Sequence, residues 1–203
     1  MRLTDLLIPP LCAACGRHCP DRAHLCARCR GRLASARPLR GVGPQGVDRA
    51  WSSAPHEGVA RDLVVALKFR RLPPVAVLMA ERMHRLAPEV LLGGEVVPVP
   101  TAPLRARGRG FDPAWEIAAA LAARSGLALS PCLQRGGAGR QVGRRRAERI
   151  GRPPSIRPAG PVPRSVLLVD DVLTTGATIS ACARALRQGG ARRVVAVTFS
   201  RRL

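Results

Sequence analysis

The chain has 203 residues, an aromatic content of 2% and a formal net charge of +21. This length can hold one α/β domain with a small appendage, and its core is large enough to fold unaided. The apolar residues 6–8 are stopped by Pro9 and Pro10, so we expect neither a signal peptide nor a membrane span, and we predict a soluble cytoplasmic protein.

The positive charge comes almost entirely from arginine, because Lys68 is the only lysine. GC-rich coding bias can explain arginine in place of lysine, but not the scarcity of acids: after Glu116 the chain has only Glu148, Asp170 and Asp171. We therefore expect a basic surface with anionic partners. A stacking platform for single-stranded bases would have few members, namely Trp51, Phe69, Phe111, Trp115 and Phe199.

Four N-terminal cysteines form two CxxC pairs, Cys12 with Cys15 and Cys26 with Cys29. Two such pairs can complete a tetrahedral shell of four thiolates, which is typical of structural Zn²⁺. Cys19, His18 and His24 lack the paired spacing and are weaker candidates as ligands; the alternative is reduced cysteines without metal. We expect Cys132 and Cys182 to be small core residues.

The segment 37–47 is rich in Pro, Gly and Arg, and we interpret it as a linker between a zinc module with its linker (1–45) and a main domain (46–203). Residues 50–54 predict a strand. Helical spacing predicts helices over 58–69 and 74–86. Lys68, near the end of the first helix, either binds a phosphate or is a solvated cation favoured by the helix dipole.

The middle of the chain alternates further elements with basic loops. Residues 95–100 predict a strand in spite of its two prolines, and Asp112 predicts the N-cap of a helix over 113–124. A strand is expected within 126–133. The segment 135–149 is rich in Gly and Arg and predicts a flexible basic stretch.

The most informative segment is 166–178. Its apolar residues 166–169 predict a strand buried on both faces of a parallel sheet, and the strand ends in Asp170 and Asp171. Thr174, Thr175 and Thr178 offer hydroxyl donors, and Gly176 permits close approach of the backbone. A helix over 179–188 follows, whose free N–H groups favour an anion. Hydrogen-bond donors for a phosphate, next to two carboxylates that can accept hydrogen bonds from sugar hydroxyls, predict a site for a ribose 5-phosphate.

A last strand over 194–199 follows Gly189 and Gly190, which suit the end of a helix. Strand, helix and strand in this order predict a βαβ unit with parallel strands.

These residues support a family resemblance. Segment 166–178 resembles the 5-phosphoribosyl 1-diphosphate (PRPP) signature of type I phosphoribosyltransferases, and nearly the whole chain resembles the competence-associated ComF family. The "LKF" at 67–69, the "VPVP" at 97–100, the basic loop through Arg109 and the spaced Gln141 and Arg149 match family elements. Asp112 and Arg152 stand where the family has Asn, and Arg144 stands where it has Leu.

The resemblance implies a type I phosphoribosyltransferase fold, a parallel sheet flanked by helices with an N-terminal four-cysteine zinc-ribbon-like module. It implies PRPP bound with Mg²⁺ and transfer of a phosphoribosyl group to an acceptor that no residue identifies. The residues it places at catalysis are Asp170, Asp171, Arg109 and Arg149. Those it places at PRPP are Val169, Asp170, Asp171, Leu173, Thr174, Thr175, Gly176, Ala177, Thr178, Thr101 and Lys68.

Two other functions remain open. ComF family members are implicated in handling incoming single-stranded DNA during natural competence, so the fold could be a scaffold for DNA uptake together with competence proteins. The basic residues Arg144, Arg145 and Arg146 would then contact phosphates. A regulator that senses PRPP without turnover is the third possibility. The sequence predicts no oligomeric state.

Overall fold

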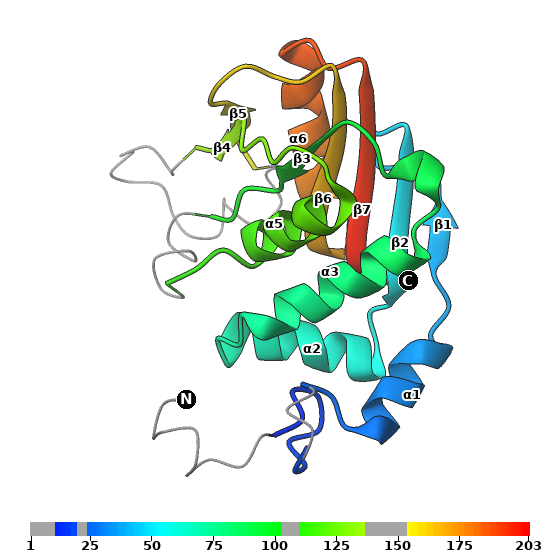
Figure 1. The fold of residues 1–203 in the computed structure, drawn as a ribbon. Helices are drawn as coiled ribbons and strands as arrows, with labels where there is room; N and C mark the ends of the chain where they lie inside the picture. The colour runs from blue at the N-terminus through cyan, green and yellow to red at the C-terminus, as the bar shows by residue number, and fades with distance from the viewer. Residues whose placement is uncertain (1–10, 20–23, 103–109, 137–153) are drawn as a thin grey trace.

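The computed structural model describes residues 11–19, 24–102, 110–136 and 154–203 (Figure 1). Arg109 and Arg149, which were expected to take part in catalysis, lie outside these ranges. Arg105, Arg107, Arg144, Arg145, Arg146 and Arg152 also lie outside them, as does Gln141.

Five strands form the main sheet, in the order β1-β2-β7-β6-β3. All neighbouring pairs are parallel except β1 with β2, so the sheet is mixed and mostly parallel. Their bounds are β1 Leu39–Gly41, β2 Arg49–Pro55, β3 Glu95–Pro98, β6 Ser165–Leu173 and β7 Arg193–Arg201. The predicted α/β fold with a parallel sheet flanked by helices is confirmed at this level.

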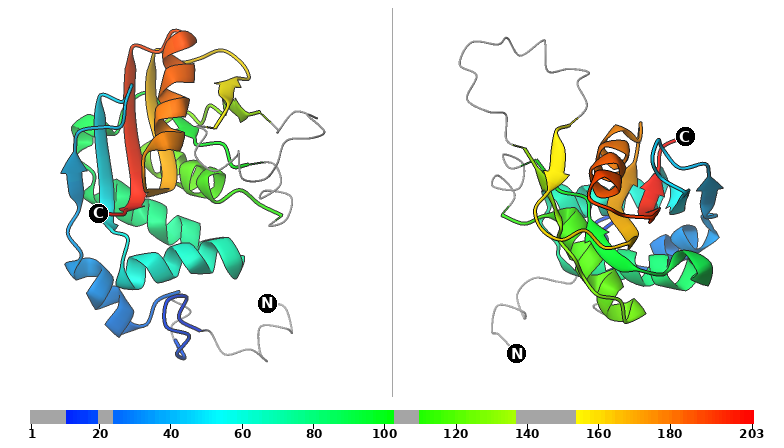
Figure 2. Two further views of the ribbon diagram at one scale, coloured as in Figure 1. Left: turned by 180° about the vertical axis from the view of Figure 1, so that it is seen from behind. Right: turned by 90° about the horizontal axis from the view of Figure 1, so that it is seen from above.

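Helices cover both faces of this sheet (Figure 2). On β6, Leu167 and Val169 pack into a core with α3 (Pro74–Leu86) and α5 (Pro113–Ser125), while Val166 and Leu168 pack into a core with α6 (Ala177–Gln188). All four side chains are fully buried. The central strand is therefore apolar on both faces, as the continuous run in the sequence predicts.

The predicted βαβ unit is confirmed as β6, α6 and β7, with Leu168 opposite Ala196 in the parallel pair. β3 lies at the edge of the sheet, which explains how a strand can contain Pro98. The predicted helix over 58–69 is α2 (Gly58–Phe69), which packs between α1 (Ala27–Ser35) and α3. A 3-10 turn, η2 (Glu89–Leu91), follows α3.

Two sequence predictions need correction. Part of the predicted linker 37–47 is strand β1, which pairs antiparallel with β2. The strand expected within 126–133 is reduced to a single bridge from Leu129 to Val96. Pro131 lacks the N–H that a ladder requires, and the strand begins only at β4 (Leu133–Arg135), which pairs with β5 (Ile156–Pro158) in a separate sheet.

The N-terminal segment shares the core of the rest of the chain. Leu25, Cys29 and Leu33 belong to the same buried cluster as Leu63 and Met79 of α2 and α3. Arg70, at the end of α2, donates from Nη1 to the Ala13 carbonyl at 3.2 Å. Within the described ranges, no helix is long and apolar enough to cross a bilayer.

Candidate functional site

A pocket of about 260 Å³ lies at the carboxyl ends of β3 and β6. This is the edge where parallel α/β sheets bind ligands. Polar side chains from well-separated segments line it: Lys68, Thr101, Arg135, Asp170, Asp171, Thr174 and Thr178. Six of these seven were predicted from sequence, and Arg135 was not.

The turn between β6 and α6 leaves hydroxyl and N–H donors open to a ligand. Thr174 and Thr175 are exposed, and Thr178 is half-buried. Gly176 has φ 76°, and a Cβ there would lie 2.7 Å from Pro44 Cγ, so both conformation and space require glycine. The first turn of α6 contains no acidic residue, so its positive dipole end is not compensated by the helix itself.

Neither of the two adjacent acids is freely exposed to solvent. Asp171 is 5% exposed, whereas Asp170 is half-buried. The Asp171 N–H donates to Asp170 Oδ1 at 2.8 Å. Burial, and then the neighbouring charge of Asp171, raise the pKa of Asp170 well above its usual value. A ligand hydroxyl or a cation near Asp170 would offset this cost of carrying a negative charge.

Lys68 forms an ion pair with Asp171, with 2.5 Å between Nζ and Oδ2. Its side chain is 24% exposed and also lines the pocket. The two readings from sequence, phosphate ligand or solvated helix-end cation, both omitted this carboxylate partner. Lys68 is therefore an ion-paired side chain and not a solvated cation. Its role in binding a phosphate remains a prediction.

Asp112 does not line the pocket but contacts two segments that do. Its carboxylate caps α5 by accepting from the Ala114 N–H at 3.0 Å, as predicted. It also accepts from Thr101 Oγ1 at 2.7 Å and from the Thr101 N–H at 3.2 Å. Asp112 thus ties the loop after β3 to the start of α5.

Sequence reasoning also missed His56. Its Nδ1 lies 2.9 Å from Ser200 Oγ, and Ser200 Oγ donates to the Asp171 carbonyl at 3.4 Å. Burial, and then the charge of Lys68, lower the pKa of His56. His56 does not line the pocket, and its place two residues after the predicted strand 50–54 is the signal that could have found it.

The other predicted PRPP residues do not line the pocket. Val169 and Leu173 are buried in the two cores, Thr175 and Gly176 belong to the turn beside the pocket, and Ala177 is the first residue of α6. Among the aromatic candidates for stacking, Trp51 and Phe199 are fully buried and so are excluded, while Phe69 is 69% exposed and Trp115 40% exposed.

The four predicted cysteines converge. The Sγ atoms of Cys12, Cys15, Cys26 and Cys29 all lie within 4.8 Å of one another, and Cys15 and Cys26 are 3.8 Å apart. Tetrahedral Zn²⁺ with Zn–S bonds of about 2.3 Å separates its sulfurs by about 3.8 Å. Thiolate ligands at this spacing fit a structural metal such as Zn²⁺. Cys19, His18 and His24 are not part of this group.

The thiols of this cluster differ in acidity. Burial raises the pKa of the Cys12 thiol, but backbone hydrogen bonds from Cys15, Cys26 and Ala14 lower it more, to about 6. Burial, and then its cysteine neighbours, raise the pKa of Cys29. Cys132 and Cys182 are buried in the core on the α6 side, as predicted.

No protein-family model matches the chain, and a search of characterised proteins finds no significant match. What the protein shows is thus an α/β fold with a mostly parallel five-stranded sheet and an N-terminal four-cysteine cluster.

Proposed function

We propose that this protein is a ComF-like phosphoribosyltransferase that binds PRPP with Mg²⁺ and transfers its phosphoribosyl group to an acceptor. One observation carries the proposal: six polar residues predicted from sequence, drawn from α2, the loop after β3 and the β6–α6 turn, line a single pocket. A polar pocket at the carboxyl edge of a parallel sheet suits a phosphorylated sugar.

The three parts of PRPP would contact different walls. The 5-phosphate would accept hydrogen bonds from Thr174 and Thr178 and from the first N–H groups of α6. Asp170 and Asp171 would accept from the two ribose hydroxyls. The pyrophosphate would extend toward Lys68, Thr101 and Arg135, the remaining donors of the pocket.

The donor set also fits Mg²⁺. Carboxylate oxygens are the ligands this ion prefers, and Asp170 lies in a setting that disfavours an uncompensated negative charge. Mg²⁺ would arrive with PRPP and supply neutralisation of the pyrophosphate charge.

In the reaction, an acceptor nucleophile would form a bond to the anomeric carbon as the bond to the pyrophosphate oxygen breaks. Asp170 and Asp171 would hold the ribose in position as positive charge develops on the ring. Lys68 and Arg135 would stabilise the negative charge of the departing pyrophosphate. Arg109 and Arg149 remain predicted contributors to that same role.

The direct test is calorimetric titration of PRPP with Mg²⁺ into the zinc-loaded wild type and into an Asp170→Asn, Asp171→Asn double variant. Asp62→Asn is the matched control, because Asp62 is an exposed acid of α2 that does not line the pocket. We expect binding in the wild type and the control and none in the double variant. A folded wild type that binds no PRPP would refute the proposal.

Turnover is then tested by the release of pyrophosphate in the presence of candidate acceptors, oligonucleotides included. Binding without turnover over that panel would favour the PRPP-sensing regulator.

A second candidate function is a scaffold that handles single-stranded DNA in natural competence. The net charge of +21 favours it. Its test is the affinity for a labelled single strand across salt concentrations, with Arg144, Arg145 and Arg146 neutralised together. If these residues contact phosphates, the slope of log affinity against log salt should fall by about 0.7 per lost contact. An unchanged slope would remove this segment from the interface.

A further inference from the structure

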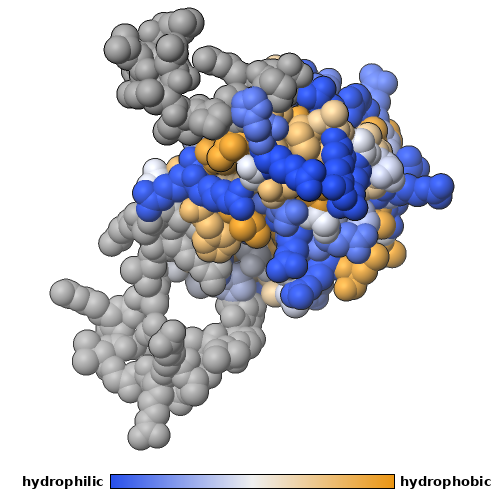
Figure 3. All heavy atoms as spheres, turned by 90° about the horizontal axis from the view of Figure 1, so that it is seen from below, coloured by the Kyte–Doolittle hydropathy of each residue, from blue (hydrophilic) through white to orange (hydrophobic). Residues whose placement is uncertain are grey.

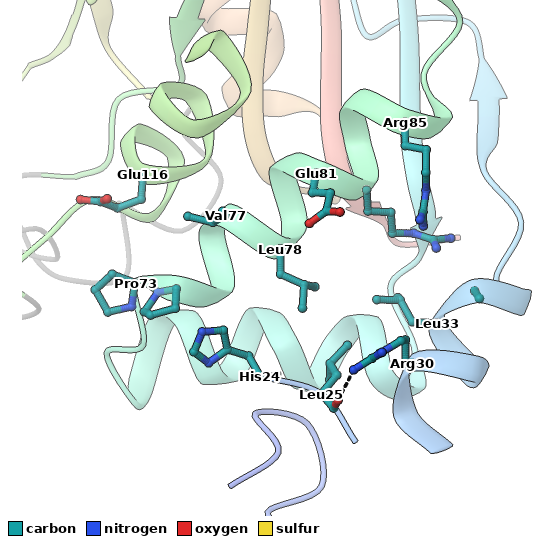
Figure 4. A pocket seen from close by; sticks show the side chains of 13 residues that line it. His24, Leu25, Arg30, Leu33, Pro73, Val77, Leu78, Glu81, Arg85 and Glu116 are labelled. Carbon is teal, nitrogen blue, oxygen red and sulfur yellow. Dashed lines mark hydrogen bonds between the residues drawn. The ribbon is translucent and has the colours of Figure 1, made fainter. Parts of the chain in front are cut away.

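A second and larger pocket, of about 920 Å³, lies between the N-terminal cysteine segment and α3 (Figure 4). Apart from Glu116 of α5, its lining comes from two stretches, 24–34 and 73–85. None of these residues lines the pocket at the carboxyl edge of the sheet. Leu25, Leu33, Val77 and Leu78 make its walls mainly apolar. Its volume is in the range typical of small-molecule sites.

Arg82 places a buried positive charge in the lining of this pocket. The residue is only 3% exposed. Its Nη2 donates to the carbonyls of Ala36 at 2.6 Å and Ser53 at 3.0 Å, while its Nε has no hydrogen-bond partner. Within the described ranges, no carboxylate lies within 4.0 Å of it. The charge is therefore solvated by two carbonyl dipoles and has no counter-ion among the described residues.

The other charged residues of the lining are distributed unevenly along the pocket. Arg30 and Arg85 lie at the same end as Leu33, while Glu116 lies at the opposite end of the pocket (Figure 4). The remaining acid, Glu81, is 53% exposed and faces Arg124 on α5 at 3.7 Å. The end of the pocket near the carboxyl terminus of α3 is thus positively charged, and its apolar walls increase the reach of that charge.

We propose that this pocket binds a small-molecule carboxylate with an apolar body, the carboxylate at the end formed by Arg30, Arg82 and Arg85 and the body along Leu25, Leu78 and Val77. Seen from below, the coloured surface is mostly hydrophilic with apolar areas between the polar ones (Figure 3). The site is separate from the proposed PRPP pocket and does not depend on it.

The lining contains one buried and uncompensated positive charge, which favours a ligand with a single negative charge. Arg30 and Arg85 are exposed, so water already solvates them. Only Arg82 is desolvated without a counter-charge, and one negative charge offsets it. A carboxylate carries one charge at neutral pH, whereas a phosphate monoester carries between about 1.5 and 2. The planar carboxylate also matches the fork of a guanidinium.

The test uses decanoate as the probe, titrated calorimetrically below its micelle concentration into the full-length, zinc-loaded chain. Decanol and acetate serve as control ligands, because decanol has the apolar chain without a carboxylate and acetate has the carboxylate without a long chain. Arg30→Glu, Arg85→Glu is the test variant, because Arg82 also bonds Ala36 and Ser53 and its loss could unfold the chain. Arg184→Glu is the matched control, since Arg184 is an exposed arginine of α6 on the opposite face of the sheet.

We expect decanoate to bind more tightly than either half-probe. The affinity should fall about a hundredfold in the double variant, because it removes two charge-assisted contacts that each contribute roughly tenfold, and it should stay unchanged in Arg184→Glu. PRPP binding by the double variant should equal that of the wild type. Three outcomes would overturn the proposal: no decanoate binding, equal binding of decanol, or an equal loss of affinity in Arg184→Glu.

Discussion

The ion pair between Lys68 and Asp171 gives the sharpest quantitative prediction. At a separation of 2.5 Å and an effective dielectric constant of about 20, the Coulomb attraction is roughly 6 to 7 kcal/mol. Desolvation costs several kcal/mol for each ion, so the net contribution of the pair is much smaller. Removal of one partner is different, because it leaves the desolvation cost of the other in place.

Lys68→Met tests this asymmetry. Asp171 is 7% exposed by its side chain and would remain buried without its cation. Loss of one partner of a fully buried pair costs about 3–5 kcal/mol, and the partial exposure of Lys68 reduces this to about 2–4 kcal/mol. For a chain of this length, the melting temperature should fall by about 4–16 °C.

The reverse change should cost less. In Asp171→Asn, the lysine retains a route to solvent, since its side chain is 24% exposed and its ammonium can extend into water. We expect a loss of about 1 kcal/mol. The double variant Lys68→Met, Asp171→Asn should be more stable than Lys68→Met alone, because no uncompensated charge remains.

Urea unfolding at neutral pH, followed by circular dichroism, measures all four proteins. Arg61→Met is the control, since Arg61 is an exposed cation of the same helix and its loss should change the free energy of unfolding by no more than about 0.5 kcal/mol. The reasoning fails if Lys68→Met is as stable as Arg61→Met, or if Asp171→Asn is the more damaging of the two single changes.

Three further predictions concern other parts of the molecule. Gly176→Ala should lower the free energy of unfolding by about 1–2 kcal/mol because of its positive φ, and by a further amount because the new Cβ would clash with Pro44. Gly126→Ala, with φ 64° and no atom within 4 Å of the new Cβ, should show the conformational loss alone. Equal losses of the two variants in thermal unfolding would contradict the contact with Pro44. Because the folded-state pKa of Asp170 is raised, the residue stabilises the fold fully only below its unfolded pKa of about 4, and this contribution is lost as pH rises through the folded value. Asp170→Asn should therefore melt higher than wild type at neutral pH while losing PRPP binding, and a lower melting temperature there would refute the pKa direction. Elemental analysis should find one zinc per chain, lost in Cys26→Ser and retained in Cys182→Ser, and a wild type without zinc would leave the four thiols as a reduced cluster.

The sequence predicts best where a signal is local and repeated. The apolar positions of α2 and α3 recur at helical spacing over three turns, so their predicted and observed bounds coincide. The segment of β6, its two acids and the following turn is equally local, because buried strand, acceptors and donors are consecutive in the chain. Short elements are harder. β1 and β4 have three residues each, too few to establish a periodicity.

Contacts between distant segments are beyond such reasoning. Nothing near Lys68 in the sequence indicates that it faces Asp171, because that contact depends on how α2 packs against the sheet. Arg135 enters the pocket from β4, which belongs to the smaller sheet and has no motif of its own. Asp112 was predicted as a helix cap from its position before Pro113, but its bonds to Thr101 required the fold.

The end of α2 connects the two sites that the sequence treats separately. Lys68 reaches Asp171 in the proposed PRPP pocket, and two residues later Arg70 donates to the carbonyl of Ala13, which lies within the first cysteine pair. The same helix packs against α1, which carries Cys29. Because these contacts hold one short segment from both sides, the position of Lys68 depends on the folded state of the cysteine loop. A metal bound by the four thiols would therefore stabilise more than its own loop: it would fix the helix end that supplies the cation facing Asp171.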